Sequence, residues 1–270
     1  MNPEATDPAT AADPATAAAL ARLYDLDLAD DPGDVDLYRA LADRGRGRVL
    51  ELAVGTGRVA IPLAAAGHRV TGVDNDRHML DRARARAAAE IAGSGGSLEL
   101  VEADLVGLAL PEGAAFDLGF LALNSLMALR TRTAQQAAIQ ALADHLVHGG
   151  IAAVDVWLPD ADDLARYDGG QILEWARPEP TTDAIVTKTG SAQYDAATGT
   201  IALTTIFEEG PQGAAAVRWV RRDRLRLVSA DELTGFAEAA GLRVETLAGD
   251  YDLDPLGPGS DRAVLVAVRP

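Results

Sequence analysis

The chain has 270 residues, of which 41 are acidic and 24 basic, and a formal net charge of −17. This excess of acid argues against binding to a nucleic-acid backbone or an anionic membrane surface, because both are bound through clustered Lys and Arg. There is no cysteine, which excludes disulfides, thiolate catalysis and Cys-ligated metals. No apolar run approaches the ~20 residues of a membrane span, and no secretory signal pattern opens the chain. We therefore expect a cytoplasmic protein.

The N-terminal segment divides in two. Residues 1–18 carry the tandem DPATAADPATAA, and its prolines and lack of large apolar groups predict a disordered tail. In residues 19–45, Leu, Tyr and Ala recur at helical spacing on both sides of a Pro32-Gly33 break. This pattern predicts two short helices joined by an acidic turn.

Residues 48–158 alternate between strand and helix patterns, which is typical of a parallel sheet. The predicted strands span 48–54, 68–74, 97–104, 116–124 and 151–158, and the predicted helices span 58–67, 78–93 and 133–150. The last helix is expected to close on two glycines. The expected core consists of Leu50, Leu52, Val73, Leu98, Leu100, Phe120, Val154 and Val156.

The pattern changes in residues 171–228, where three β-prone runs with turn signals between them predict antiparallel strands. We interpret this insertion as a β cap over the carboxyl edge of the main sheet, where ligands bind in open α/β folds. Ser229 and Glu232 then predict a capping box at the start of a helix over 229–242. Two further strands are expected to complete the main sheet.

The segment 51–76 is the most informative for function. A strand enters Gly55-Thr56-Gly57, a helix follows directly, and the next strand ends in Asp74. Glycines let the backbone approach a ligand closely, and an acid at the second strand's end can bind a ribose diol. The spacing Gly55-x-Gly57-x-x-Ala60 with Asp74 fits a dinucleotide fingerprint, and it equally fits an S-adenosylmethionine (SAM) site.

Further acids and a polar strand end favour SAM. Glu51 lies in the strand before the glycine turn, and the third strand ends in Glu102-Ala103-Asp104, where a carboxylate can accept a hydrogen bond from an adenine amine. The fourth strand ends in small and polar residues. Each acid also has a purely structural interpretation, since Asp74 and Asp104 precede turns or helices that they could cap and Glu51 could be an ordinary buried acid.

With these motifs the sequence resembles the class I SAM-dependent methyltransferases, and among them the bacterial small-molecule enzymes of natural-product and amino-sugar metabolism. The resemblance covers residues 20–270 and rests on V-L-E-L-A-x-G-T-G-R, V-T-G-V-D, M-L-x-R-A-R, E-A-D-L, N-S-L, H-G-G and G-D-Y-D. It implies a Rossmann-like seven-stranded sheet with the last strand antiparallel, a domain over 19–270, and residues 19–45 as a helical lid. The residues expected to bind SAM are Tyr24, Glu51, Ala53, Gly55, Thr56, Gly57, Asp74, Asn75, Met79, Ala103, Asp104, Leu105, Leu123 and Asn124.

The sequence departs from the family pattern at two places. Ala53-Val54 replaces the commoner Gly-Cys, and Ala128 stands where many relatives have a histidine. The second change removes the obvious general base, so methylation of a neutral amine is favoured over that of a hydroxyl or a carbon. A NAD(P)-dependent oxidoreductase and a SAM-binding protein without catalytic activity remain the alternatives.

Residues of the acceptor site are expected at the sheet edge and in the cap. Trp157, Trp175, Arg226 and Tyr251 are the candidates for substrate contact, and Asn124, Trp157 and Tyr251 could position the reacting groups. No pair of histidines has metal-site spacing. The expected product is S-adenosyl-L-homocysteine (SAH), the acceptor is a small molecule, and the protein is a monomer or a homodimer formed through the β cap.

Overall fold

The computed structural model describes residues 13–270 except 31, 46, 112, 183, 212 and 214. Its main sheet has seven strands in the order β10-β11-β5-β4-β1-β2-β3, and every neighbouring pair is parallel except the two formed by β11. Its strands are β1 Arg48–Leu52, β2 Arg69–Asp74, β3 Ser97–Glu102, β4 Phe116–Leu121, β5 Leu146–Trp157, β10 Arg243–Ala248 and β11 Arg262–Val268. The predicted Rossmann-like sheet with its last strand antiparallel is confirmed.

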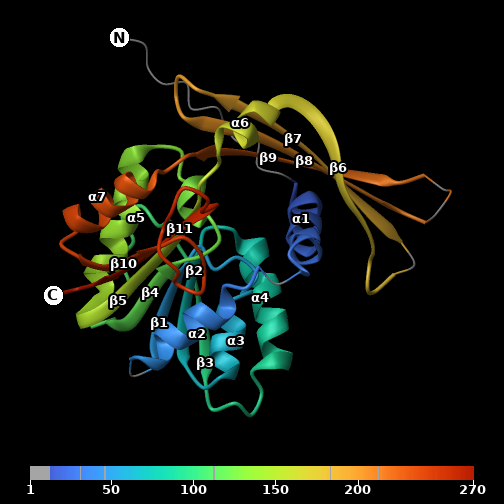
Figure 1. The fold of residues 1–270 in the computed structure, drawn as a ribbon. Helices are drawn as coiled ribbons and strands as arrows, with labels where there is room; N and C mark the ends of the chain where they lie inside the picture. The colour runs from blue at the N-terminus through green and yellow to red at the C-terminus, as the bar shows by residue number, and fades with distance from the viewer. Residues whose placement is uncertain are drawn as a thin grey trace, which may run out of the picture.

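Helices cover both faces of this sheet (Figure 1). On one face, α5 Arg132–His145 and α7 Ala230–Ala239 bury a cluster that includes Leu50, Leu52 and Val154. On the other face, α2 Val35–Asp43, α3 Ala60–Ala65 and α4 Arg77–Glu90 pack on Val49 and Phe120. Alternate residues of β1 thus belong to different cores, as strand geometry requires.

Six of the eight residues expected in the core are buried, whereas Leu98 and Leu100 are partly exposed. Both lie on β3, which forms one edge of the sheet. A strand at the edge has a neighbouring strand on one side only, so its side chains are covered less completely.

A second, antiparallel sheet of four strands forms the β cap (Figure 1), in the order β6-β7-β8-β9. Its strands are β6 Asp168–Pro178, β7 Ile185–Asp195, β8 Thr200–Gly210 and β9 Val217–Arg226. The prediction of three strands was therefore one strand short. In β6 the pairing with β7 shifts register twice and nearly all side chains are exposed, so the strand carries no apolar alternation for a sequence pattern to reveal.

The N-terminal helix α1 Pro14–Asp27 lies between α4 and the β cap (Figure 1). It begins at Pro14, inside the segment expected to be a disordered tail, because the Asp13 side chain accepts hydrogen bonds from the N–H groups of Ala15 and Thr16. Residues 1–12 lie outside the described residues. Two further short helices are η1 Ser125–Ala128 and α6 Ala161–Arg166.

Two predicted helix ends differ from the structure. Helix α5 ends at His145, and the pair Gly149-Gly150 belongs to the start of β5, where the pairing with β4 shifts register between Phe116 and Leu118. A Cβ on Gly150 would lie 3.0 Å from the carbonyl oxygen of Phe116, so the glycine is needed for strand approach rather than for helix termination. At α7, Ser229 caps the helix as predicted, whereas the carboxylate of Glu232 pairs with Arg226.

Candidate functional site

The turn after β1 has a left-handed backbone at three nearby positions. Ala53, Gly55 and Gly57 have φ angles of 57°, 54° and 80°. A Cβ on Gly57 would lie 2.9 Å from Cδ1 of Ile61, so this position needs glycine for space as well as for conformation. Ala53 adopts the left-handed region despite its Cβ, at a cost of ~1–2 kcal/mol, which a glycine at this position would avoid.

The carboxylate of Asp74 fastens this turn to the end of β2. Its Oδ2 accepts a 2.8 Å hydrogen bond from the Gly55 N–H, and its Oδ1 accepts one of 2.8 Å from the Asp76 N–H. Burial raises the pKa of Asp74 above its ordinary value, against the effect of these donors. Asp76 in turn caps α4 through the N–H of His78. The turn after β1 and the end of β2 are therefore joined by hydrogen bonds to the Asp74 carboxylate.

A cavity of about 390 Å³, which we call the Asp74 cavity, opens beside the glycine turn and the end of β2. The structure brings together six of the predicted SAM-binding residues in its wall: Tyr24, Ala53, Gly55, Asp74, Asn75 and Met79. Residues from α1, η1 and β9, with the N-cap residue of α4, complete the wall. The sequence did not identify these residues, which are Ala17, Leu20, Ala21, Asp76, Ser125, Arg221 and Asp223. Ala128, which the sequence marks as the position where the family pattern has a histidine, also lines the cavity.

Other predicted SAM-binding residues lie outside this wall. Glu51 and Gly57 are buried. Five others, at or just after the ends of β3 and β4, are Ala103, Asp104, Leu105, Leu123 and Asn124. Asp104 is exposed, and its Oδ1 accepts a 2.8 Å hydrogen bond from the Val106 N–H. Its carboxylate thus holds a turn, as the structural interpretation expected.

A second cavity, of about 420 Å³, lies on the other side of Tyr24 and contains Thr56 and Arg58; we call it the Arg58 cavity. Both terminal nitrogens of Arg58 donate 2.6 Å hydrogen bonds to the buried carboxylate of Asp34. Arg58 directly follows the glycine turn, so its place beside Gly57 was the signal that could have identified it.

Two buried oxygens near the glycine turn, Glu51 Oε2 and Thr56 Oγ1, have no hydrogen-bond partner among the described residues. Burial raises the pKa of Glu51 well above its usual range, although the Arg58 guanidinium acts in the opposite direction. Unsatisfied buried polar groups are costly, so a polar ligand that reached either oxygen would stabilise the folded state.

The end of β5 carries a network that the sequence did not reveal. The carboxylate of Asp155 is fully buried and accepts hydrogen bonds from the Tyr38 hydroxyl at 2.6 Å, the Leu123 N–H at 2.8 Å and the Tyr251 hydroxyl at 3.1 Å. Arg262 also donates to the Tyr251 hydroxyl. Since Arg262 pairs with Trp157 in the sheet register, Tyr251 and Trp157 both lie at the carboxyl edge, as expected for acceptor-site residues.

The remaining residues proposed for the substrate have structural partners. The indole N–H of Trp175 donates to Asp27 of α1 at 2.9 Å. Both terminal nitrogens of Arg226 donate to the carboxylate of Glu232, at 2.9 and 2.8 Å. Asn124 has a φ of 64°, and its Oδ1 accepts a hydrogen bond from the Trp157 N–H, so it ties the ends of β4 and β5 together.

No described residue that lines the Asp74 cavity is a histidine or a lysine. Its titratable side chains are Tyr24, Asp74, Asp76, Arg221 and Asp223, and the last two form an ion pair of 2.7 Å. Burial raises the pKa of Tyr24, which keeps its hydroxyl protonated near neutral pH. The cavity can therefore bind polar groups but contains no imidazole to remove a proton from an acceptor.

The helices of the described residues include none that is both long and apolar enough to cross a membrane.

Comparison with known proteins adds three findings. A family model described as a methyltransferase domain matches residues 49–150, which hold the glycine turn and Asp74. No curated protein sequence matches the chain. Among solved structures, the CcbJ methyltransferase from Streptomyces caelestis is similar with a TM-score of 0.72 and 26% identity, over 90% of this chain and 98% of that one.

Two further solved structures share the fold at lower identity. An S-adenosylmethionine-dependent methyltransferase from Clostridium acetobutylicum has a TM-score of 0.73 and 16% identity, over 93% of this chain and 97% of that one. The sugar N-methyltransferase KedS8 from Streptoalloteichus has a TM-score of 0.70 and 20% identity, over 91% and 92%. The resemblance stated from the sequence is confirmed by the matched domain together with these folds.

Proposed function

We propose that this SAM-dependent methyltransferase transfers the methyl group of SAM to an amine of a small molecule. The observation that carries the choice of an amine is the wall of the Asp74 cavity, where Ala128 stands in place of a base and none of the described lining residues is a histidine or a lysine. A neutral amine has its own lone pair, whereas a hydroxyl must lose its proton as the new bond forms.

We further propose how the chain holds SAM. The Asp74 carboxylate is in position to accept hydrogen bonds from a ribose diol, since both of its oxygens are already oriented by backbone N–H groups. Asn75 and Met79 lie beside it for the adenine, and Tyr24 of α1 covers the cavity. The Arg58 cavity and the unpartnered oxygens of Glu51 and Thr56 lie next to the turn, toward the methionine end.

The reaction needs positioning more than acid–base chemistry. The amine nitrogen attacks the methyl carbon, the carbon–sulfur bond breaks, and the electron pair of that bond stays on sulfur, which leaves SAH and a methylated ammonium. The ammonium then loses its proton to water. Holding nucleophile, methyl and sulfur in line while water is excluded can contribute ~7–11 kcal/mol. Asn124, Trp157 and Tyr251 at the sheet edge are the residues that we propose for this positioning.

The first experiment is calorimetric titration of the full chain with SAM, SAH, NAD and NADP. We expect SAM and SAH to bind and the nicotinamide nucleotides to give no heat. Asp74→Asn should weaken SAH binding at least about tenfold, because a charged acceptor of two hydroxyl groups is lost. Asp81→Asn, an exposed acid on α4, is the matched control and should leave the affinity unchanged.

The second experiment identifies the atom that is methylated. SAM with a labelled methyl group is incubated with matched pairs of acceptors that differ only in an amine or a hydroxyl at one position. Amino sugars are tested first, since KedS8 is a sugar N-methyltransferase with this fold. Transfer to the amine member alone supports the proposal, and transfer to the hydroxyl member alone refutes the choice of an amine.

A further inference from the structure

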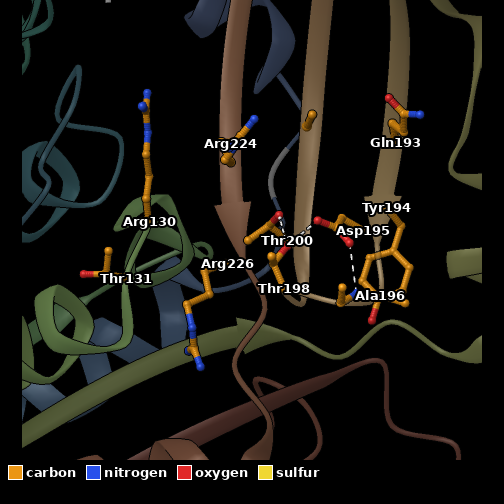
Figure 2. Close-up of a pocket in the computed structure, with 12 residues that line it drawn as sticks. Arg130, Thr131, Gln193, Tyr194, Asp195, Ala196, Thr198, Thr200, Arg224 and Arg226 are labelled. Atoms are coloured by element: carbon orange, nitrogen blue, oxygen red, sulfur yellow. Dashed lines mark hydrogen bonds between the residues drawn. The ribbon is translucent and has the colours of Figure 1, made fainter. Parts of the chain in front are cut away.

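A third cavity lies away from Asp74, in the wall of the β cap. It measures about 830 Å³, and we call it the Arg224 cavity. Figure 2 shows its wall, with Arg130 and Thr131 on one side and Gln193, Tyr194 and Asp195 on the other. Arg224 of β9 stands between them. The cavity thus lies where the β cap meets the segment between η1 and α5.

The three arginines in this wall differ in their partners. Neither Arg130 nor Arg224 forms an ion pair or a hydrogen bond with any residue that the structure describes, and both are exposed. The third, Arg226, is neutralised by Glu232 and turns the opposite way from Arg130 and Arg224 in Figure 2. Unpaired cations are notable in a chain that carries 41 acids and only 24 bases.

The acid in the wall is already engaged. Asp195 accepts a 2.9 Å hydrogen bond from the Ala197 N–H and a 2.8 Å hydrogen bond from the Thr198 hydroxyl, both within the β7–β8 turn. Its carboxylate therefore holds the turn rather than either guanidinium, although its charge lies near Arg224. Thr131 on the facing wall is the N-cap of α5, so the positive end of that helix adds to the field of the two arginines.

We propose that the Arg224 cavity binds a phosphate or diphosphate group of a small molecule, between the guanidinium groups of Arg130 and Arg224. Guanidinium groups bind such oxyanions through paired, charge-assisted hydrogen bonds. Two free cations match the charge of a phosphate dianion better than that of a single carboxylate. Residues 221 and 223 of the same strand line the Asp74 cavity, so this site is separated from the methyl donor's cavity by β9.

The test is calorimetric titration of inorganic pyrophosphate into the full chain loaded with SAH. The variants are Arg130→Gln combined with Arg224→Gln, and Arg222→Gln as the matched control. Arg222 is exposed on the same strand and has no ion pair among the described residues, but it does not line the cavity. We expect the double variant to weaken pyrophosphate binding at least about tenfold and the control to change it less than about twofold.

Pyrophosphate that fails to bind the SAH complex, or that binds the double variant as tightly as the unaltered chain, overturns the proposal. SAH affinity is measured on every variant, and an unchanged value shows that each one folds. SAH binding and pyrophosphate binding are separate readouts, so failure of this site leaves the methyltransferase proposal intact. If SAH itself does not bind, the same pyrophosphate titration is made on the free chain, so failure of the methyltransferase proposal leaves this test intact.

Kinetics then identify the source of the anion. Methyl transfer is measured with acceptor amines that carry or lack a phosphate ester. If the acceptor carries the anion, pyrophosphate competes with the phosphorylated amine, and the double variant raises KM for that amine alone. If a separate molecule carries it, pyrophosphate alters the rate equally for both amines. Either outcome supports the site, whereas a rate that responds to pyrophosphate equally in the double variant contradicts it.

Discussion

The hydroxyl of Tyr38 donates a 2.6 Å hydrogen bond to the carboxylate of Asp155, which lies 117 residues later in the chain. Both side chains are fully buried, and the ring of Tyr38 stacks on Phe120 with centroids 4.2 Å apart. The same carboxylate accepts from the Leu123 N–H, so helix α2 and the ends of β4 and β5 are joined at one charge. These buried hydrogen bonds therefore hold in place the sheet edge that we propose positions the acceptor.

Tyr38→Phe should lower the free energy of unfolding by about 1.5–3 kcal/mol, because a buried charged acceptor loses one donor. The measurement is urea denaturation followed by circular dichroism. Tyr194→Phe is the control, since the Tyr194 hydroxyl has no hydrogen-bond partner among the described residues, and it should change stability by less than about 0.5 kcal/mol. Equal effects of the two variants would show that the Tyr38 hydrogen bond contributes nothing specific.

Glu51→Gln should change how stability depends on pH. Burial raises the pKa of Glu51 in the folded state well above its ordinary value. An acidic group whose pKa is higher in the folded than in the unfolded state stabilises the folded state at pH values below the unfolded-state pKa. This stabilisation is lost as the pH rises through the folded-state pKa. The unaltered chain should therefore lose melting temperature relative to Glu51→Gln as the pH rises above about 4, the ordinary pKa of a glutamate.

The variant comparison is needed because the whole chain carries a net charge of −17, which also affects stability as the pH changes. Glu90→Gln on the exposed side of α4 removes one charge without burial and should follow the unaltered chain. If the difference in melting temperature between the unaltered chain and Glu51→Gln is the same at every pH, the pKa of Glu51 is not raised in the folded state.

Lys188→Met should speed the release of SAH. Lys188 of the β cap donates hydrogen bonds of 2.8 and 2.7 Å to Asp27 of α1, the helix that supplies Tyr24 to the Asp74 cavity. Partly buried charged hydrogen bonds contribute on the order of 1–2 kcal/mol, so the dissociation rate should rise about fivefold to thirtyfold. Stopped-flow measurement of protein fluorescence during displacement of SAH gives this rate.

Arg218→Gln is the control for that experiment. It breaks an exposed ion pair with Glu208 on the same cap, and no hydrogen bond or ion pair joins it to the described residues of α1. Exposed pairs contribute little to stability. If both variants release SAH at the rate of the unaltered chain, the ion pair of Lys188 does not hold α1 over the cavity.

Ala53→Gly should stabilise the protein by about 0.5–1 kcal/mol, because it relieves a left-handed alanine at φ 57° and this gain exceeds the entropy that glycine loses on folding. The same substitution in the exposed middle of α4, Ala85→Gly, should instead destabilise by about 1 kcal/mol. Urea denaturation measures both variants. A loss of stability at position 53 would mean that the alanine is not strained there.

Local sequence predicted the parallel sheet and the glycine turn with Asp74, because apolar periodicity and turn glycines act over a few residues. The antiparallel last strand was implied by the resemblance to the methyltransferase family and is confirmed by the sheet order. Of the six predicted residues in the wall of the Asp74 cavity, Gly55 and Asp74 followed from the local pattern, since strand ends on one edge of a parallel sheet converge. The other four were implied by the family resemblance.

Only the tertiary structure decided which polar side chains remain free. Arg226 and Trp175 looked equally suited to a ligand in the sequence, yet the first pairs with Glu232 and the second with Asp27, 148 residues away. Asp155 had no visible role until folding brought Tyr38 and Tyr251 to it, from 117 and 96 residues away. Ion pairs and hydrogen bonds depend on distances in space, and no pattern along the chain records them before the sheet, the helices and the cap have packed.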